Sequence, residues 1–191
     1  PISAFELNLD EMRKWIENIP SVDSAVVMVS AAGLLSVKVL EIPAAFVWRN
    51  EDGLKLVSRN GKILRNIMYR IDFGHLPLIA GKGAVAALAE AQSILVYANP
   101  ILDRLRGLVR VGQRRWNLIL LDGQTIALPE NGPELALSQA IVLGQAQNLF
   151  KRDISVIDFR NPGRPTLRIR PIALRNMKKS KIATLLEDQN E

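Results

Sequence analysis

Residues 116–128 read WNLILLDGQTIAL, two short apolar runs on either side of an Asp122-Gly123 pair. Asp-Gly between apolar runs is a strong hairpin signal, because both residues accept the positive φ angles of a two-residue turn. The stretch therefore predicts two antiparallel strands. Because Trp116, Leu118 and Leu120 alternate with their neighbours, we expect these three side chains to face the core.

Similar short apolar runs, broken by Gly, Pro and Asn, continue in both directions along the chain. They predict a strand-rich chain in which sequential strands are antiparallel neighbours. Besides the hairpin strands 116–121 and 124–128, the expected strands are residues 25–29, 35–42, 46–49, 54–58, 62–64, 108–111, 154–159 and 166–170.

Three helices are predicted among these strands. Residues 9–18 follow Asn8, whose spacing from Glu11 is that of a capping box. An alanine-rich stretch, 84–97, ends before an Asn-Pro stop signal. The third helix, 133–150, begins with a proline in its first turn. Its expected buried face consists of Ala136, Ala140, Leu143, Ala146 and Phe150. The fold class is therefore α+β: a helix and a β-hairpin, then a mainly antiparallel sheet with two or three packed helices.

Composition excludes some classes of protein. The chain has no cysteine, which excludes disulfides, thiolate metal sites and cysteine nucleophiles. Its net charge of +6 suits nucleic acid, an anionic membrane face or a solubilising surface, but the basic residues are scattered. No stretch approaches the roughly 18 uninterrupted apolar residues of a spanning helix. The first residue is Pro1 rather than Met, so we expect an upstream segment that served as a signal or an anchor.

Catalytic motifs are missing. The single histidine, His75, has no partner set for a catalytic triad, and the carboxylates are too dispersed for a metal site. Gly81-Lys82-Gly83 precedes a predicted helix like the end of a phosphate loop. That loop would need Gly in place of Leu76 and Ser or Thr in place of Gly83, so we read a glycine hinge. We expect no catalytic residues, no metal and no cofactor.

Nucleic-acid binding would need a basic face with stacking aromatics. Arg114-Arg115-Trp116 is the nearest motif, but on a strand the two arginines point to opposite faces and the tryptophan belongs to the apolar alternation. Core packing explains the motif at least as well. We therefore expect no nucleic-acid partner.

The last predicted strand has the features of a sheet edge. Arg168 and Arg170 alternate with apolar residues, and Pro165 and Pro171 bracket the strand. Proline cannot donate to a central ladder, and charged side chains protect edges from random pairing. Two readings stay open: an edge without a partner, or one that accepts a strand from another chain.

Several short motifs follow one another along nearly the whole chain. They are Ile19-Pro20-Ser21-Val22, Leu40-Glu41-Ile42-Pro43, Val47-Trp48-Arg49, Leu76-Pro77-Leu78-Ile79-Ala80-Gly81, Arg114-Arg115-Trp116-Asn117-Leu118 and Ile157-Asp158-Phe159-Arg160-Asn161-Pro162-Gly163-Arg164. Their order and spacing resemble the FtsQ/DivIB family of bacterial cell-division proteins, specifically its alphaproteobacterial members.

The resemblance implies a domain organisation and a location. Residues 1–43 would be the C-terminal part of a POTRA domain, lacking its opening strand and helix; 44–177 would be the family's β domain, and 178–191 a charged tail. The whole protein would cross the inner membrane once, through a helix absent from this chain. This region would lie in the periplasm at the division septum.

The resemblance also implies a function. It is that of a non-enzymatic divisome scaffold that binds FtsB and FtsL, among other divisome proteins, and links early and late division proteins to septal peptidoglycan synthesis. A POTRA-type secretion or outer-membrane assembly factor and a basic nucleic-acid-binding domain are the alternatives. The expected partner-binding residues are Arg114, Arg115, Arg160, Asn161, Gly163, Thr166, Leu167, Arg168, Ile169 and Arg170. Among them, Arg160 matches a family arginine that pairs with a partner carboxylate.

Overall fold

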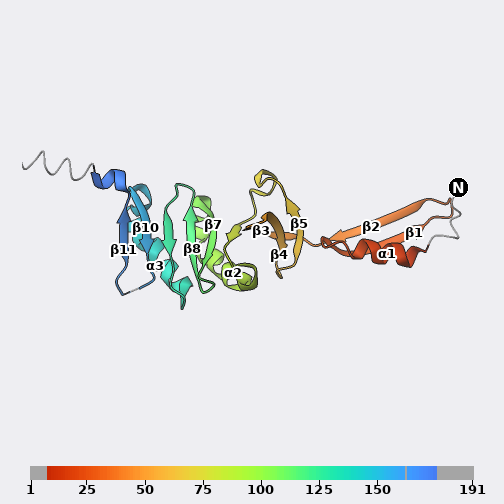
Figure 1. The fold of residues 1–191 in the computed structure, drawn as a ribbon, viewed down its shortest axis with the longest axis horizontal. Coiled ribbons are helices and arrows are strands. Elements are labelled where there is room, and N and C mark those ends of the chain that lie inside the picture. The colour runs from red at the N-terminus through yellow and green to blue at the C-terminus, as the bar shows by residue number, and fades with distance from the viewer. Residues whose placement is uncertain (1–7, 162, 176–191) are drawn as a thin grey trace, which may run out of the picture. The chain divides into compact units, whose positions relative to one another are not determined.

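The computed structural model describes residues 8–161 and 163–175. The chain divides into two compact units, Pro1–Ile79 and Ala80–Glu191 (Figure 1). The predicted domain boundary at 43/44 stays a prediction, and the predicted tail, 178–191, lies outside the described residues. Within the described ranges, no helix is long and apolar enough to cross a membrane.

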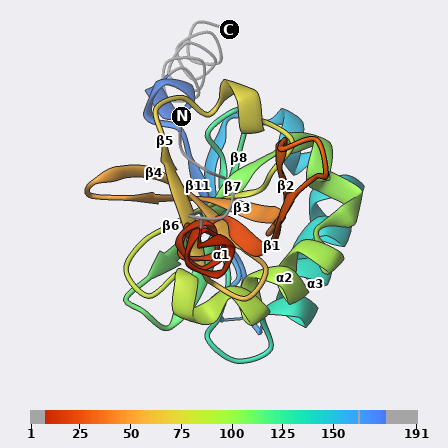
Figure 2. The same ribbon diagram turned by 90° about the vertical axis from the view of Figure 1, so that its right-hand side faces the viewer.

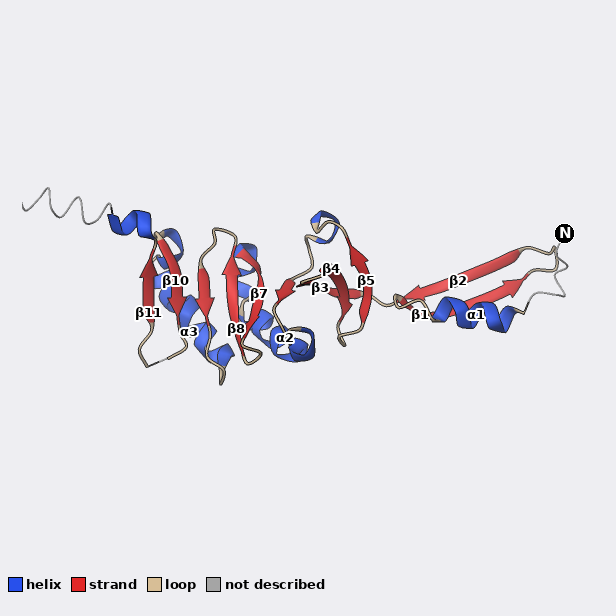
Figure 3. Cartoon of the chain, viewed as in Figure 1, coloured by secondary structure: helices blue, strands red, loops and turns tan. Residues whose placement is uncertain are grey.

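The first unit opens with a helix and a hairpin, as predicted. Helix α1 (Leu9–Glu17) is followed by the antiparallel strands β1 (Val22–Val29) and β2 (Leu35–Glu41). The side chain of Asn8 accepts a hydrogen bond from the Glu11 N–H at 3.1 Å, which confirms the predicted N-cap. Figure 3 shows α1 lying along β1. The core here is small, because every residue of β2 is exposed.

Three further antiparallel strands form the rest of the first unit. They are β3 (Ala44–Asn50), β4 (Gly53–Ser58) and β5 (Ile63–Ile67), each paired with the next. Val47, Leu56 and Leu64 form their buried cluster. The short 3-10 helix η1 (Ile71–Phe73) follows β5. Strand β6 (Leu78–Ala80), at the boundary of the two units, was not predicted, since three residues are too short to show an alternation.

The second unit contains the hairpin that opened the sequence argument. Its strands are β7 (Leu105–Val111), β8 (Arg115–Leu120), β9 (Thr125–Ala127), β10 (Ile154–Asp158) and β11 (Thr166–Ile169). The hydrogen-bonded order is β11-β10-β9-β8-β7. All pairs are antiparallel except β9 with β10. The sheet is therefore mainly antiparallel, as predicted. Trp116, Leu118 and Leu120 are buried, which confirms the predicted core face.

Two helices pack against each other on one side of these strands (Figure 2). Helix α2 (Leu88–Tyr97) is preceded by the 3-10 helix η2 (Val85–Ala87) and followed by the 3-10 helix η3 (Asn99–Arg104). Helix α3 (Pro133–Ala146) lies in the connection between the two parallel strands. A hydrogen bond of 2.8 Å from the Ser93 hydroxyl to the Glu134 carboxylate joins the two helices.

The predicted extent of the third helix was wrong at its C-terminal end. Helix α3 stops at Ala146, which is exposed, instead of continuing to Phe150. Asn148 adopts a left-handed conformation (φ 52°), and the 3-10 helix η4 (Leu149–Lys151) then turns Phe150 into the core. The ring of Phe150 packs on the backbone of Gly144, where an added Cβ would lie 2.4 Å from its Cζ. The buried face is accordingly Ala136, Leu137, Ala140, Ile141 and Gly144.

Candidate protein-binding edge

Strand β11 is the last strand of its sheet, so one of its long sides has no neighbouring strand. This confirms the prediction of an edge. All four of its residues are exposed, and Leu167 and Ile169 show 44% and 38% of their surface. An open edge presents unpaired N–H and C=O groups to any extended segment that can align with it.

The inner side of β11 is firmly held. Its residues pair with β10 from Thr166 opposite Asp158 to Ile169 opposite Ile154. The Ser155 hydroxyl donates to the Arg168 carbonyl at 3.0 Å. Just beyond the strand, the Arg170 N–H donates to the Asp153 carbonyl at 2.8 Å, and its guanidinium donates to the Asp122 carbonyl at 2.7 Å. The strand is thus fixed on one side and open on the other.

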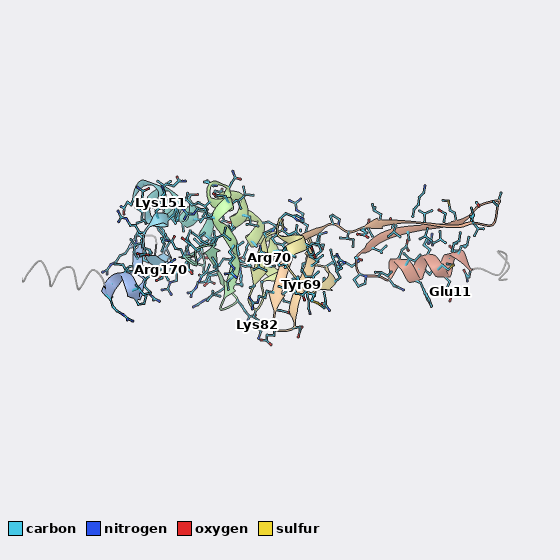
Figure 4. The ribbon with its side chains drawn as sticks, turned by 90° about the horizontal axis from the view of Figure 1, so that it is seen from above. Glu11, Tyr69, Arg70, Lys82, Lys151 and Arg170 are labelled. Atoms are coloured by element: carbon cyan, nitrogen blue, oxygen red, sulfur yellow. The ribbon has the colours of Figure 1, made fainter. Side chains whose placement is uncertain are left out.

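An apolar hollow of about 630 Å³ lies beside β11. Leu167 and Ile169 contribute its strand side, and they share one face of the strand because side chains alternate. The remaining lining residues are Lys151, Arg152, Asp153, Ile154 and Ala173. Figure 4 labels Lys151 and Arg170 at this end of the second unit. The hollow could accept an apolar side chain of a segment that pairs with β11.

A second hollow, of about 520 Å³, is polar and basic. Its lining residues are Arg115, Asp158, Arg160, Asn161, Arg164 and Thr166. Thr166 lies on the opposite face of β11 from Leu167 and Ile169. Because three arginines face one aspartate, the hollow carries a net positive charge suited to a carboxylate.

Arg160 already has a partner within the chain. Its Nε lies 2.9 Å from both oxygens of Asp158, and its Nη2 lies 2.5 Å from Oδ2. The side-chain hydrogen bond from Arg160 lowers the pKa of Asp158, and the charge of Arg115 also contributes. Half of the Arg160 side chain remains exposed, so a partner carboxylate would share this guanidinium with Asp158.

The structure separates the two arginines of the Arg-Arg-Trp motif. Arg115 begins β8 and lines the basic hollow, and its Nε has no hydrogen-bond acceptor among the described residues. Arg114 precedes the strand, is exposed, and lies 3.9 Å from the Glu130 carboxylate. It does not line the hollow.

The remaining expected site residues lie in the turn before β11. Asn161 lines the basic hollow, and Gly163 is exposed beside it. Sequence reasoning missed Arg164 and Asp158 as members of the hollow. The signal that could have found them was present: Asp158 and Arg160 are two residues apart, and Arg164 follows the same turn.

The motifs considered for chemistry have other roles in the structure. His75 is exposed in the loop before β6. Among the described residues, no three His, Asp or Glu side chains gather into a metal-binding group. Gly81 has φ +96°, and a Cβ there would lie 2.2 Å from the Arg110 carbonyl oxygen. Close backbone approach therefore explains the first glycine of Gly81-Lys82-Gly83.

Comparison with known proteins assigns the family. The sequence model described as "Cell division protein FtsQ/DivIB, C-terminal" matches residues 46–160, more than half of the chain. The match ends before β11.

Curated relatives match almost the whole chain. It is 41% identical to Cell division protein FtsQ of Cereibacter sphaeroides over 95% of its length, and 41% identical to that of Dinoroseobacter shibae over 91%. It covers 59% of each relative. It is also similar to the solved extracytoplasmic domain of DivIB from Geobacillus stearothermophilus, with 15% identity and a TM-score of 0.40 over 58% of this chain and 97% of that one. The family model and the curated relatives together show that this chain belongs to the FtsQ/DivIB family of cell-division proteins.

Proposed function

We propose that the chain is the partner-binding part of a non-enzymatic divisome scaffold, and that β11 docks a strand of FtsB. Through FtsB and FtsL the scaffold would link early and late division proteins to septal peptidoglycan synthesis. In the whole protein, a transmembrane helix outside this chain would hold it in the inner membrane, with residues 1–43 and 44–177 as two periplasmic domains. Membership of a cell-division family supports this assignment over the secretion-factor and nucleic-acid alternatives.

The observation that carries the proposal is the direction of the backbone groups of β11. The Arg168 carbonyl accepts from Ser155 of β10, and the Arg170 N–H donates to Asp153 just before β10. Alternate residues of a strand direct their N–H and C=O groups to the same side. Arg168 and Arg170 therefore face β10, whereas Leu167 and Ile169 direct their N–H and C=O groups outward.

The two hollows supply selectivity on opposite faces of the added strand. A segment paired with β11 directs alternate side chains to the two faces of the sheet. On one face lies the apolar hollow beside Leu167 and Ile169. On the other lies the basic hollow at Thr166. The partner strand would thus carry apolar residues on one face and a carboxylate, placed near Arg115, Arg160 and Arg164, on the other.

Two neighbouring proline substitutions test the docking edge. Leu167→Pro removes an outward-facing N–H donor and leaves the bonds to β10 in place. Arg168→Pro removes an inward-facing donor and should weaken the β10–β11 pairing itself. Calorimetry with the purified periplasmic segment of FtsB should show that Leu167→Pro loses binding while its circular dichroism and melting temperature stay near wild type. Arg168→Pro should lower the melting temperature.

Two further variants complete the design. Leu167→Ala keeps the N–H and removes the side chain, so it should retain part of the affinity. Ile169→Pro removes the second outward-facing donor and should behave like Leu167→Pro. If folded Leu167→Pro and Ile169→Pro both bound FtsB as tightly as wild type, β11 would not be the docking site.

A further inference from the structure

Residues 68–71, directly after β5, expose their apolar side chains and turn their arginine inward. Met68, Tyr69 and Ile71 show 81%, 67% and 86% of their surface. Arg70 is half-buried, and its guanidinium donates to the Leu76 carbonyl at 3.4 Å. Water alone would favour the opposite arrangement, since apolar side chains gain by burial and charged ones by hydration.

Several contacts fix this turn in place. The Phe73 N–H donates to the Arg70 carbonyl at 2.9 Å, and the Leu76 N–H donates to the Phe73 carbonyl at 3.0 Å. The ring of Phe73 packs against the Val47, Leu56 and Leu64 cluster, and the Arg65 guanidinium lies 5.4 Å from its centre. The outward direction of the apolar side chains therefore belongs to a structured turn. Figure 4 labels Tyr69 and Arg70 on it.

Basic residues surround the apolar ones. Residues 59–75 contain Arg59, Lys62, Arg65 and Arg70 against a single Asp72. An apolar tip with a cationic surround matches the boundary of an acidic bilayer, where apolar side chains enter the acyl region and cations meet the headgroups. Tyrosine is itself enriched at that boundary.

Two other occupants fit this surface less well. Three projecting side chains form a patch far smaller than the roughly 800 Å² that each partner contributes to a standard protein interface. A second copy of the chain would have to pair β5 with β5. Antiparallel pairing about the centre of that strand would place Arg65 opposite Arg65, and directly opposed like charges are destabilising.

We propose that residues 68–71 insert into the headgroup region of an acidic phospholipid bilayer, with Lys62 and Arg65 contacting its phosphates. The proposal does not depend on the β11 edge, because it rests on residues of the first unit alone. It gives the chain a lipid-binding surface of its own.

The absence of cysteine from the sequence allows a clean test. A polarity-sensitive fluorophore is attached to Met68→Cys and, as a matched control, to Val142→Cys on α3, which is 66% exposed. Vesicles of phosphatidylglycerol and phosphatidylethanolamine should shift the emission to the blue for the label at position 68 only. Neutral phosphatidylcholine vesicles should have a weaker effect, and added salt should reduce the shift.

Sedimentation with the same vesicles gives a second measurement. Met68→Ser/Ile71→Ser should lower the fraction bound by roughly tenfold, because two inserted apolar side chains are lost. Leu135→Ser/Val142→Ser removes two side chains that are each 66% exposed on α3 and should change nothing. Equal responses at positions 68 and 142, or no response at 68, would overturn the proposal. A response at 68 to delipidated membrane proteins, but not to vesicles, would also overturn it, in favour of a protein partner.

Discussion

Gly144→Ala should destabilise the second unit even though alanine is the better helix former. The new Cβ would lie 2.4 Å and 2.5 Å from two ring atoms of Phe150, whereas carbon atoms in contact stand about 3.5–4.0 Å apart. The ring must therefore retreat by about 1 Å or more. It has little room, because Phe150 is only 6% exposed and its carbonyl accepts a 2.8 Å hydrogen bond from Arg104.

The magnitude follows from two opposing effects. Overpacking of a core costs about 1–3 kcal/mol. Replacing glycine within a helix returns up to about 1 kcal/mol. We expect a net loss of about 1 kcal/mol in the free energy of unfolding, or a melting temperature lower by about 2–4 °C.

Urea unfolding of the second unit measures this loss. The chain has three tryptophans, so a Trp15→Phe/Trp48→Phe background leaves Trp116 as the only reporter, in the second unit. Phe150→Leu removes the ring, and in that background Gly144→Ala should become neutral or stabilising. If Gly144→Ala cost the same with and without the Phe150 ring, the contact between these residues would not be the cause.

Three further predictions concern the binding edge and the chemistry. Arg160→Ala should weaken FtsB binding by about 1 kcal/mol in calorimetry, near the lower end for charge pairs, because half of this side chain is exposed; an unchanged affinity would remove Arg160 from the site. Asp158 has a lowered pKa because Arg160 donates to its carboxylate, so its stabilising effect is complete above its unfolded pKa near 3.8 and is lost as the pH falls through the folded value. Wild type should therefore lose more stability than Asp158→Asn between about pH 5 and about pH 3, and parallel stability curves would contradict this reasoning. His75→Ala should leave division intact in a complementation assay, since this exposed loop histidine belongs to no described cluster of ionisable groups; loss of division with a folded protein would reveal an unrecognised site.

Local patterns predicted most strands because each pattern is complete within a few residues. The Asp122-Gly123 turn fixed one hairpin, and the prolines around β11 indicated its edge position. The end of α3 could not be predicted, because it depends on Asn148 adopting positive φ so that Phe150 can reach Gly144. The parallel pairing of β9 and β10 was also not specified, since β9 is three residues long and its pairing depends on a distant strand.

The binding site shows the same division between local and distant information. Sequence alternation identified the exposed face of β11 but could not decide between Arg114 and Arg115, because that choice depends on where β8 begins. The basic hollow combines residues from β8, β10, the following turn and β11. No local pattern contains all of them. The apolar turn at residues 68–71 was missed because a loop has no periodicity from which exposure can be inferred.

The parallel pairing of β9 with β10 affects the order in which the chain can fold. Ile126 pairs with Ile157, and all of α3 and η4 lies between them, whereas the β7–β8–β9 hairpins close over short turns. Contacts distant in sequence form late, because the entropy of closing the longer loop must be lost first. Gln124, buried next to β9, donates to the Leu149 and Arg152 carbonyls and would lock this closure. Strand β11 can join the sheet only after β10 has done so, and a newly made chain would therefore acquire its docking edge at the end of folding.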